Sequence, residues 1–263
     1  MSRRLTLGPT LLILAVWVLL TIGAGLALGD GQHASLSHAA GAGIGFPWLF
    51  AAALALAVAW RNGAGPMGLG SPKPFASIRL VWLPLTYVCA MLAVDMLIGM
   101  PAPATLLVVA INMILVGFSE EVMFRSIVFH GMLARFRIWP AVLLTSLLFG
   151  AVHALNVFGT GQLQPALMQS LTAFMQGVAY QAIRLRTGSV WPMVAVHALW
   201  DFSLVLPGLS HPAGDTGSGG SVLPVVVALP VFLYGLFLLR HLQRDYGNWS
   251  DVARMPKPRG EQP

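Results

Sequence analysis

Charged residues are scarce in this chain. Asp, Glu, Lys and Arg make up only 9% of its 263 residues, whereas hydrophobic residues make up 57%. A soluble domain carries about 25% charged residues, so too few are present here to cover a surface that faces water. This scarcity excludes an ordinary soluble protein and predicts an integral membrane protein.

Cysteine is nearly absent, and the common zinc-protease motif is missing. Cys89 is the single cysteine, which excludes an intramolecular disulfide and any metal site built from several cysteines. The sequence contains no HExxH motif. The usual zinc-protease site, with two histidines one helical turn apart, is therefore not expected.

Apolar runs are what the chain has in abundance. A membrane-spanning helix needs roughly 20 predominantly apolar residues, and about eight runs come near or exceed that length. We therefore predict an all-α, polytopic membrane protein with about eight transmembrane helices. One transmembrane domain is expected over residues 1–241, with its motif core at 104–205, followed by a poorly ordered cytoplasmic tail at 242–263. The predicted spans are 7–28, 43–60, 79–99, 104–134, 138–158, 165–185, 189–207 and 222–241.

Basic residues are absent from every second loop of this arrangement. Residues 29–42, 100–103, 159–164 and 208–221 contain no Lys or Arg, and every basic residue except Arg125 falls on the other side. The positive-inside rule makes that other side the cytoplasm and puts both termini there. The net charge of +6 thus predicts orientation and contact with anionic lipid headgroups. We expect the lipid bilayer, and not nucleic acid, as a partner, and a bacterial inner membrane as the location.

Three short polar clusters interrupt the apolar runs. They are SEEVMFR at 119–125, FGAVH at 149–153 and HALWD at 197–201. Charged side chains at membrane depth cost several kcal/mol unless they are paired or solvated, so such residues are functional-site candidates. The candidates for one buried acid/base site are Glu120, Glu121, Arg125, His153, His197 and Asp201.

The spacing in the first cluster predicts different environments for its two glutamates. Glu121 and Arg125 are four residues apart, where a helix allows an ion pair. Glu120 points about 100° away and is the better candidate for a free carboxylate that acts as a general base or acid. The alternative is that all three form a polar staple that only holds helices together.

The other two clusters offer histidines with neighbours one helical turn away. Phe149 can pack beside His153, and Asn156 can orient that ring or line the same cavity. Asp201 lies four residues after His197 and can accept a hydrogen bond from it. A divalent metal such as zinc is a further possibility, because two histidines and a carboxylate form a known ligand set. Its ligands would be Glu120, His153 and His197, and the spacing does not decide between metal and no metal.

The three motifs together resemble those of a known membrane family. EExxxR, FxxxH and HxxxN/D, in this order, are similar to the motifs of the CPBP family, also called ABI. This family contains type II CAAX prenyl endopeptidases and bacteriocin-processing or bacteriocin-immunity proteins. The resemblance covers about residues 104–205, and the stretch RTGSVWPMVAVHALWD at 186–201 is similar to the family's third-motif region.

This resemblance implies roles for the site residues. Glu120 and His153 are expected to activate a water, and His197 with residue 201 to stabilise the oxyanion, while Arg125 holds Glu121. The CAAX endopeptidases have Asn at the last motif position, where this chain has Asp201. Because an ionised Asp repels an oxyanion, Asp201 is either protonated or only orients His197.

These observations predict an intramembrane endopeptidase that resembles the CAAX proteases. It is expected to cleave a peptide or protein substrate, including one that is itself associated with the membrane, near the cytoplasmic leaflet. One alternative is a non-catalytic scaffold or immunity-like protein of the same family. Another is a proton-coupled transporter, because Glu, His and Asp chains also form proton relays. Against the transporter, the sequence shows no internal repeat of the kind many transporters have.

Overall fold

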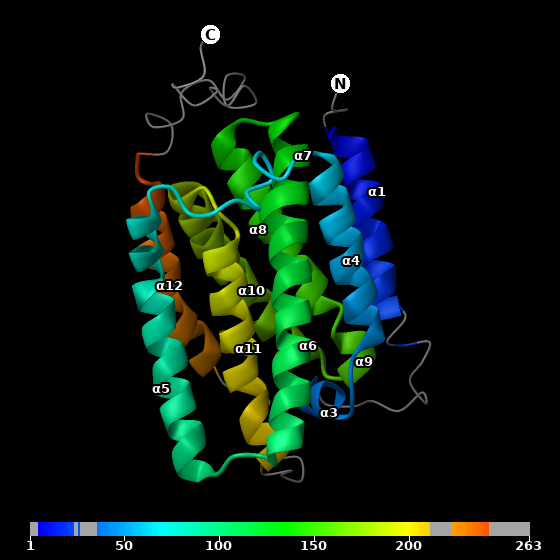
Figure 1. Ribbon diagram of the computed structural model, residues 1–263, viewed down its shortest axis with the longest axis vertical. Coiled ribbons are helices and arrows are strands. Elements are labelled where there is room, and N and C mark those ends of the chain that lie inside the picture. The colour runs from blue at the N-terminus through cyan, green and yellow to red at the C-terminus, as the bar shows by residue number, and fades with distance from the viewer. Residues whose placement is uncertain (1–4, 24–25, 27–35, 211–221, 242–263) are drawn as a thin grey trace.

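The structure is a bundle of helices (Figure 1). The computed structural model describes residues 5–23, 26, 36–210 and 222–241, and this part of the chain contains no strand. The predicted tail at 242–263 lies outside the described residues. In chain order the elements are α1 (Leu7–Val18), the π-helical segment η1 (Leu19–Gly23), α3 (Leu36–Gly41), α4 (Phe46–Arg61), the 3-10 segment η2 (Phe75–Val81), α5 (Trp82–Ile98), α6 (Pro103–Val122), the π-helical segment η3 (Met123–Val128), α7 (Phe129–Leu133), α8 (Ile138–Ala154), α9 (Val157–Thr160), α10 (Leu163–Thr187), α11 (Trp191–Ser210) and α12 (Leu223–Leu239).

Each of the eight predicted apolar runs contains one long helix, so the prediction of an all-α membrane protein is confirmed. Among the described residues, four helices are long and apolar enough to cross a membrane: Phe75–Ile98, Pro103–Leu133, Ile138–Thr160 and Trp191–Ser210. Three apolar helices are shorter: Leu7–Gly23, Phe46–Arg61 and Leu223–Leu239. The count of eight spans therefore stays a prediction.

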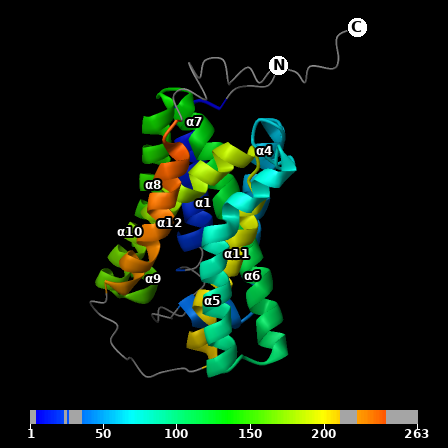
Figure 2. The ribbon, with the colours of Figure 1, turned by 90° about the vertical axis from the view of Figure 1, so that its left-hand side faces the viewer.

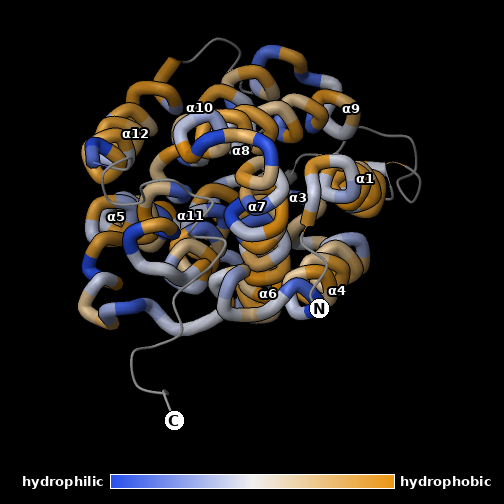
Figure 3. Tube along the Cα trace, turned by 90° about the horizontal axis from the view of Figure 1, so that it is seen from above, coloured by the Kyte–Doolittle hydropathy of each residue, from blue (hydrophilic) through white to orange (hydrophobic). Residues whose placement is uncertain are grey.

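The second half of helix α10 is buried within the bundle. It packs against α8 on one side and α12 on the other, as the view along the bundle shows (Figure 3). Every residue from 177 to 185 is buried, including Tyr180, Gln181 and Arg184. Polar side chains are costly where a helix faces lipid, so burial among other helices explains why this less apolar sequence forms a helix of the bundle.

Helix α11 lies between α5 and α6, and α6 also packs against α4 (Figures 1 and 2). These contacts position the motif helices, because α6 carries the first cluster and α11 the third. Helix α8, which carries the second cluster, is held in turn by α10. The first and third motifs thus lie on helices that pack with α4 and α5, and the second lies on a helix that packs with α10.

The connectors alternate between the two ends of the bundle. Helix α1 begins and α12 ends at the upper end in Figure 1, where the connector 62–74, the α7–α8 turn and the α10–α11 turn also lie. The α5–α6 turn and α3 lie at the opposite end. Seen from the upper end, the connectors are mostly hydrophilic and the helices mostly hydrophobic (Figure 3). This alternation agrees with the distribution of basic residues, while the assignment of the upper end to the cytoplasm stays a prediction.

The connector 62–74 is hydrogen-bonded to the helices beneath it. Ser126 Oγ donates to the Met67 carbonyl at 2.5 Å, and Trp191 Nε1 donates to the Leu69 carbonyl at 2.7 Å. Both donors belong to helices that carry a motif, η3 and α11. The connector therefore ties these two helices together at the upper end of the bundle.

The helix over 103–133 is continuous. Helix α6 passes directly into the π-helical segment η3 and then into α7. A π-helical turn is wider than an α-helical turn and often occurs at functional sites. Here it begins at Met123, directly after the two glutamates of the first cluster.

Two glycines allow the motif helices to approach closely. A Cβ on Gly117 of α6 would lie 3.0 Å from the Ala198 backbone nitrogen of α11. A Cβ on Gly150 of α8 would lie 2.7 Å from the Ser170 carbonyl oxygen of α10. Small residues at such crossings are typical of helix packing in membranes, and here they bring the three motifs within reach of one another.

We expect Gly150→Ala to lower the thermal stability of the purified protein in detergent. The added methyl meets backbone, so α8 and α10 must separate, and overpacking of this kind costs about 1–3 kcal/mol. Each kcal/mol corresponds to about 2–4 °C in a chain of this size. Gly8→Ala is the control, because nothing lies within 4 Å of a Cβ at Gly8. Equal melting temperatures for the two variants would contradict this packing.

Candidate active site

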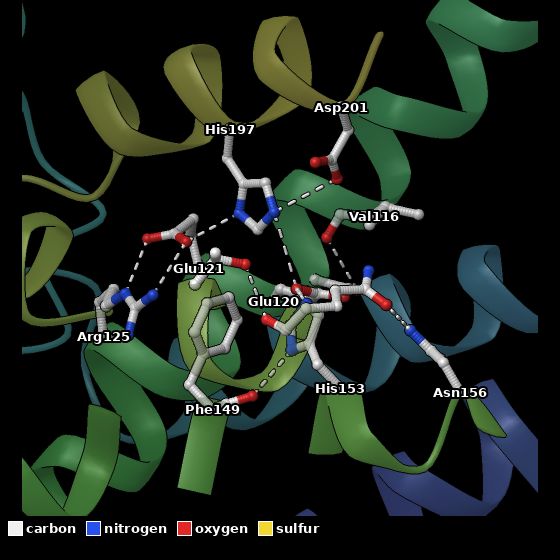
Figure 4. A network of polar contacts seen from close by, with 12 residues as sticks. Val116, Glu120, Glu121, Arg125, Phe149, His153, Asn156, His197 and Asp201 are labelled. Atoms are coloured by element: carbon white, nitrogen blue, oxygen red, sulfur yellow. Dashed lines mark hydrogen bonds and ion pairs between the residues drawn. The ribbon is translucent and has the colours of Figure 1, made fainter. Parts of the chain in front are cut away.

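The structure brings the three sequence motifs to one place inside the bundle (Figure 4). The first motif lies where α6 passes into η3, the second at the end of α8, and the third in the middle of α11. The side chains that meet there are Glu120, Glu121, Arg125, Phe149, His153, His197 and Asp201.

Glu121 and Arg125 form the ion pair that their spacing predicted. Arg125 Nε lies 3.0 Å from Glu121 Oε2, and both side chains are fully buried. Arg125 Nη2 also donates to Glu121 Oε1 at 3.4 Å. The guanidinium lies over the Phe149 ring, with Cζ 4.3 Å from the ring centroid. An aromatic face attracts a cation, so Phe149 supports the pair from α8.

Glu121 has a second partner, which the sequence did not reveal. Its Oε1 lies 2.8 Å from His197 Nδ1. The two residues are 76 positions apart in the chain, so no local spacing rule could have paired them. A carboxylate oxygen accepts, so Nδ1 donates the hydrogen bond to Glu121. This contact fixes the ring of His197 and turns its Nε2 toward Glu120.

Glu120 differs from its neighbour in having an oxygen without a hydrogen-bond partner. Its Oε2 lies 3.8 Å from His153 Nε2 and 3.7 Å from His197 Nε2. Both distances are too long for direct hydrogen bonds, and this buried atom has no other partner in the described part of the protein. The staple interpretation therefore fits Glu121 and Arg125, whereas Glu120 is the free carboxylate that the sequence predicted.

His153 is oriented by the backbone. Its Nδ1 lies 2.8 Å from the Phe149 carbonyl oxygen, and since a carbonyl only accepts, Nδ1 carries the proton. Nε2 then points toward Glu120. The His153 ring also packs edge-to-face on the Phe149 ring, with centroids 4.7 Å apart, as the spacing predicted.

Asn156 does not supply the hydrogen bond that orients His153. Its Nδ2 instead donates to Gln169 Oε1 of α10 at 2.9 Å. Both side chains are half-buried. This amide pair joins the turn after α8, where Asn156 lies beside the site (Figure 4), to the first half of α10.

Asp201 contacts the ring nitrogen of His197 that faces the site. Its Oδ2 lies 3.3 Å from His197 Nε2, and its side chain is 26% exposed, against 15% for Glu120 and none for Glu121. The predicted contact between His197 and Asp201 is therefore present. The hydrogen bond that orients the His197 ring is made by Glu121 on Nδ1. Asp201 lies on the more exposed side of the site, next to Nε2.

The possible metal site finds no support in this geometry. In the part of the chain that the structure describes, no group of three or more His, Cys, Asp or Glu residues is arranged to hold a metal ion. Glu120 Oε2 lies 3.8 Å from His153 Nε2 and 3.7 Å from His197 Nε2. Ligands of one tetrahedral zinc lie closer, at about 3.3–3.4 Å, given bonds of about 2.0–2.1 Å.

Sequence analysis missed Tyr180, which lies on α10 and outside all three motifs. Its ring centroid is 5.9 Å from that of His197, and Arg125 Cζ is 5.9 Å from the Tyr180 ring. The signal that could have found it is the lower hydropathy of the predicted span 165–185. A span with several polar residues must turn them toward other helices.

Comparison with known proteins gives one informative result for this chain. A family model described as Type II CAAX prenyl endopeptidase Rce1-like matches residues 102–203. No curated protein and no solved structure gives a significant match. The matched segment begins where α6 begins and contains every residue of the three motifs. The resemblance predicted from the motifs is thereby confirmed for residues 102–203, which match the Rce1-like family of type II CAAX prenyl endopeptidases.

Proposed function

We propose that this membrane protein is an endopeptidase that hydrolyses a peptide bond with a water activated by Glu120 and His153. The observation that carries the proposal is the buried Glu120 Oε2, which has no hydrogen-bond partner in the described residues and faces two histidine Nε2 atoms. A purely structural cluster would satisfy this atom. The family match over residues 102–203 supports the same reaction class.

The nucleophilic water belongs between Glu120 and His153. Polar atoms separated by more than 3.5 Å are commonly bridged by a water, and Glu120 Oε2 is 3.8 Å from His153 Nε2. The proton on Nδ1 leaves Nε2 as an acceptor for that water. Glu120 takes a proton as the water oxygen bonds to the carbonyl carbon, and it returns the proton to the leaving amine when the C–N bond breaks.

The carbonyl oxygen gains negative charge in this step and needs a donor. His197 Nε2 supplies one when the ring is protonated, because Glu121 on Nδ1 and Asp201 near Nε2 surround it with negative charge. A donor that is already in place costs no reorganisation during the reaction. Glu121 and Arg125 act as positioning residues, since both are fully buried and bound to each other.

The substrate is proposed to be a peptide or a protein segment at the membrane, cleaved near the cytoplasmic leaflet. In support, the first motif lies in the half of helix 103–133 that leads to the upper end of the bundle. The sequence predicts the basic connectors, and hence the cytoplasm, at that end. No observation favours the scaffold or the transporter.

The direct test uses the purified protein in detergent with a peptide library. One half of the library ends in a CaaX sequence with a prenylated cysteine, and the other half carries the same sequences unmodified. In heavy-oxygen water, hydrolysis puts one heavy oxygen atom into the new carboxyl group, which mass spectrometry detects. Failure to cleave any peptide in a Glu120-dependent manner would overturn the proposed function, and the preferred half of the library identifies the substrate class.

Glu120→Gln is expected to abolish cleavage and leave the protein folded. The amide has nearly the shape of the carboxylate but cannot accept the proton, and a general base contributes about 10²–10⁴-fold. Rates and elution profiles of the two purified proteins in detergent measure both effects. Asp95→Asn is the matched control, since Asp95 is also a buried membrane carboxylate but lies on α5 outside the motifs. Wild-type cleavage by Glu120→Gln would remove Glu120 from the mechanism.

Arg125→Ala is expected to lower the yield and thermal stability of folded protein as well as activity. The substitution leaves the fully buried Glu121 carboxylate without its main counter-charge, and breaking a buried pair costs about 3–5 kcal/mol. Arg135→Ala removes an exposed arginine a few residues further on and should change neither quantity. If Arg125→Ala folds as stably as the parent and loses only activity, the assignment of a positioning role is wrong.

Asp201→Asn and Asp201→Leu are expected to behave differently. Asn can still contact His197 Nε2 and can also donate to the oxyanion, so this variant should keep much of the activity. Leu removes the negative charge 3.3 Å from His197 Nε2 and offers no donor in its place, so the rate should fall by about 10²–10³-fold, the effect of losing His197 as an oxyanion donor. An unchanged turnover number for Asp201→Leu in the peptide assay would show that Asp201 has no part in the reaction.

A further inference from the structure

Tyr180 forms a wall of the site from a helix that none of the motifs includes. It is 1% exposed, and its ring lies beside both His197 and Arg125, at 5.9 Å from each. Phe149 lies beside the same two side chains, with its ring centroid 6.0 Å from that of His197. The two aromatic rings therefore flank the histidine and the arginine of the site.

The hydroxyl group of Tyr180 is not explained by packing. Its oxygen is buried and has no hydrogen-bond partner among the described residues. A buried polar group without a partner destabilises the folded state, and each such group in a native protein calls for a reason. A phenylalanine ring at this position would make the same aromatic contacts at no such cost.

Three of the buried side-chain atoms without a hydrogen-bond partner in the described residues belong to the site. Besides Tyr180 Oη they include Glu120 Oε2 and Arg125 Nη1, both buried. Glu121 already has Arg125 and His197 as partners, which leaves the hydroxyl available to a bound substrate.

The proposed reaction lacks a second donor for the developing oxyanion. His197 offers one through Nε2, whereas an ionised Asp201 only accepts hydrogen bonds. Oxyanion sites commonly use two donors. A tyrosine hydroxyl keeps its proton at neutral pH and can donate without becoming charged.

We propose that Tyr180 donates a hydrogen bond, alongside His197, to the carbonyl oxygen of the scissile peptide as that oxygen becomes negative. No proton is transferred: the phenol keeps its hydrogen, and the bond making and breaking are those of the proposed hydrolysis. This inference rests on the proposed function. It adds a catalytic residue from α10, so that the site is built from four helical segments of the bundle.

Tyr180→Phe tests the proposal through the turnover number, which should fall, and the melting temperature, which should not. The turnover number for the cleaved peptide should fall by about 10²-fold, the effect of one lost donor, with little change in KM. The melting temperature should stay equal or rise, because the variant removes a buried hydroxyl that has no protein partner. Gain of stability with loss of activity is typical of a residue retained for function.

Tyr234→Phe is the matched control. Tyr234 lies on α12, away from the motifs, and its hydroxyl donates to the Leu80 carbonyl at 3.0 Å. Removing it should leave the turnover number unchanged and lower the melting temperature or leave it the same. Of the two Tyr→Phe variants, only Tyr180→Phe is therefore expected to lose turnover, and only Tyr234→Phe can lose thermal stability.

Three outcomes would overturn the assignment. A wild-type turnover number for Tyr180→Phe would show that the hydroxyl takes no part in catalysis. A lower melting temperature or loss of folded protein would show that the hydroxyl holds the fold. A raised KM with unchanged turnover number would place it in ground-state binding. Cleavage by Glu120→Gln would instead refute the proposed function itself, so the two failures are distinguishable.

Discussion

The buried Glu121 carboxylate is the constraint on which the rest of the site depends. In an apolar bundle an ionised group must find partners, because an uncompensated charge there costs several kcal/mol. Glu121 satisfies this requirement with Arg125 one turn further along the chain and with His197 on α11. One carboxylate thereby fixes the guanidinium, the imidazole ring and the distance between the two helices that carry them. Phe149 completes the arrangement by packing against both the guanidinium and the imidazole ring.

The two adjacent glutamates show how helix geometry separates structure from chemistry. A step of one residue turns the side chain by about 100°, so Glu121 points into the ion pair and Glu120 toward the two histidines. Glu121 is fully buried with both oxygens occupied, whereas Glu120 has a buried oxygen that no described residue satisfies. In the same low-dielectric surroundings, Glu121 is thus held rigidly by its partners. Glu120 keeps an oxygen that can still accept a hydrogen bond or a proton, and a reacting carboxylate needs such an oxygen.

Local spacing predicted much of this site, because short-range helix contacts depend only on the residues between them. The pairs Glu121–Arg125 and His197–Asp201 and the packing of Phe149 on His153 all follow from a separation of four residues. The contact between Glu121 and His197 could not be predicted, since it depends on how α6 crosses α11. Asn156 was assigned a local partner but bonds to Gln169 of α10. Tyr180 was overlooked for the same reason, as it reaches the site only through the packing of α10 in the interior.

By itself the sequence determined the class of protein, the helical elements and the identity of the motif residues. Composition, apolar runs and pairs of residues four positions apart can all be read from the order of residues. None of them depends on which helix lies beside which. Only the tertiary structure decided which ring nitrogen each carboxylate meets, which glutamate is satisfied and which is not, and that α10 supplies a wall of the site. Those features arise from contacts between residues far apart in the chain. The way in which the helices cross determines which atoms come within hydrogen-bonding distance, and close contacts such as that of Gly117 with Ala198 set the crossing.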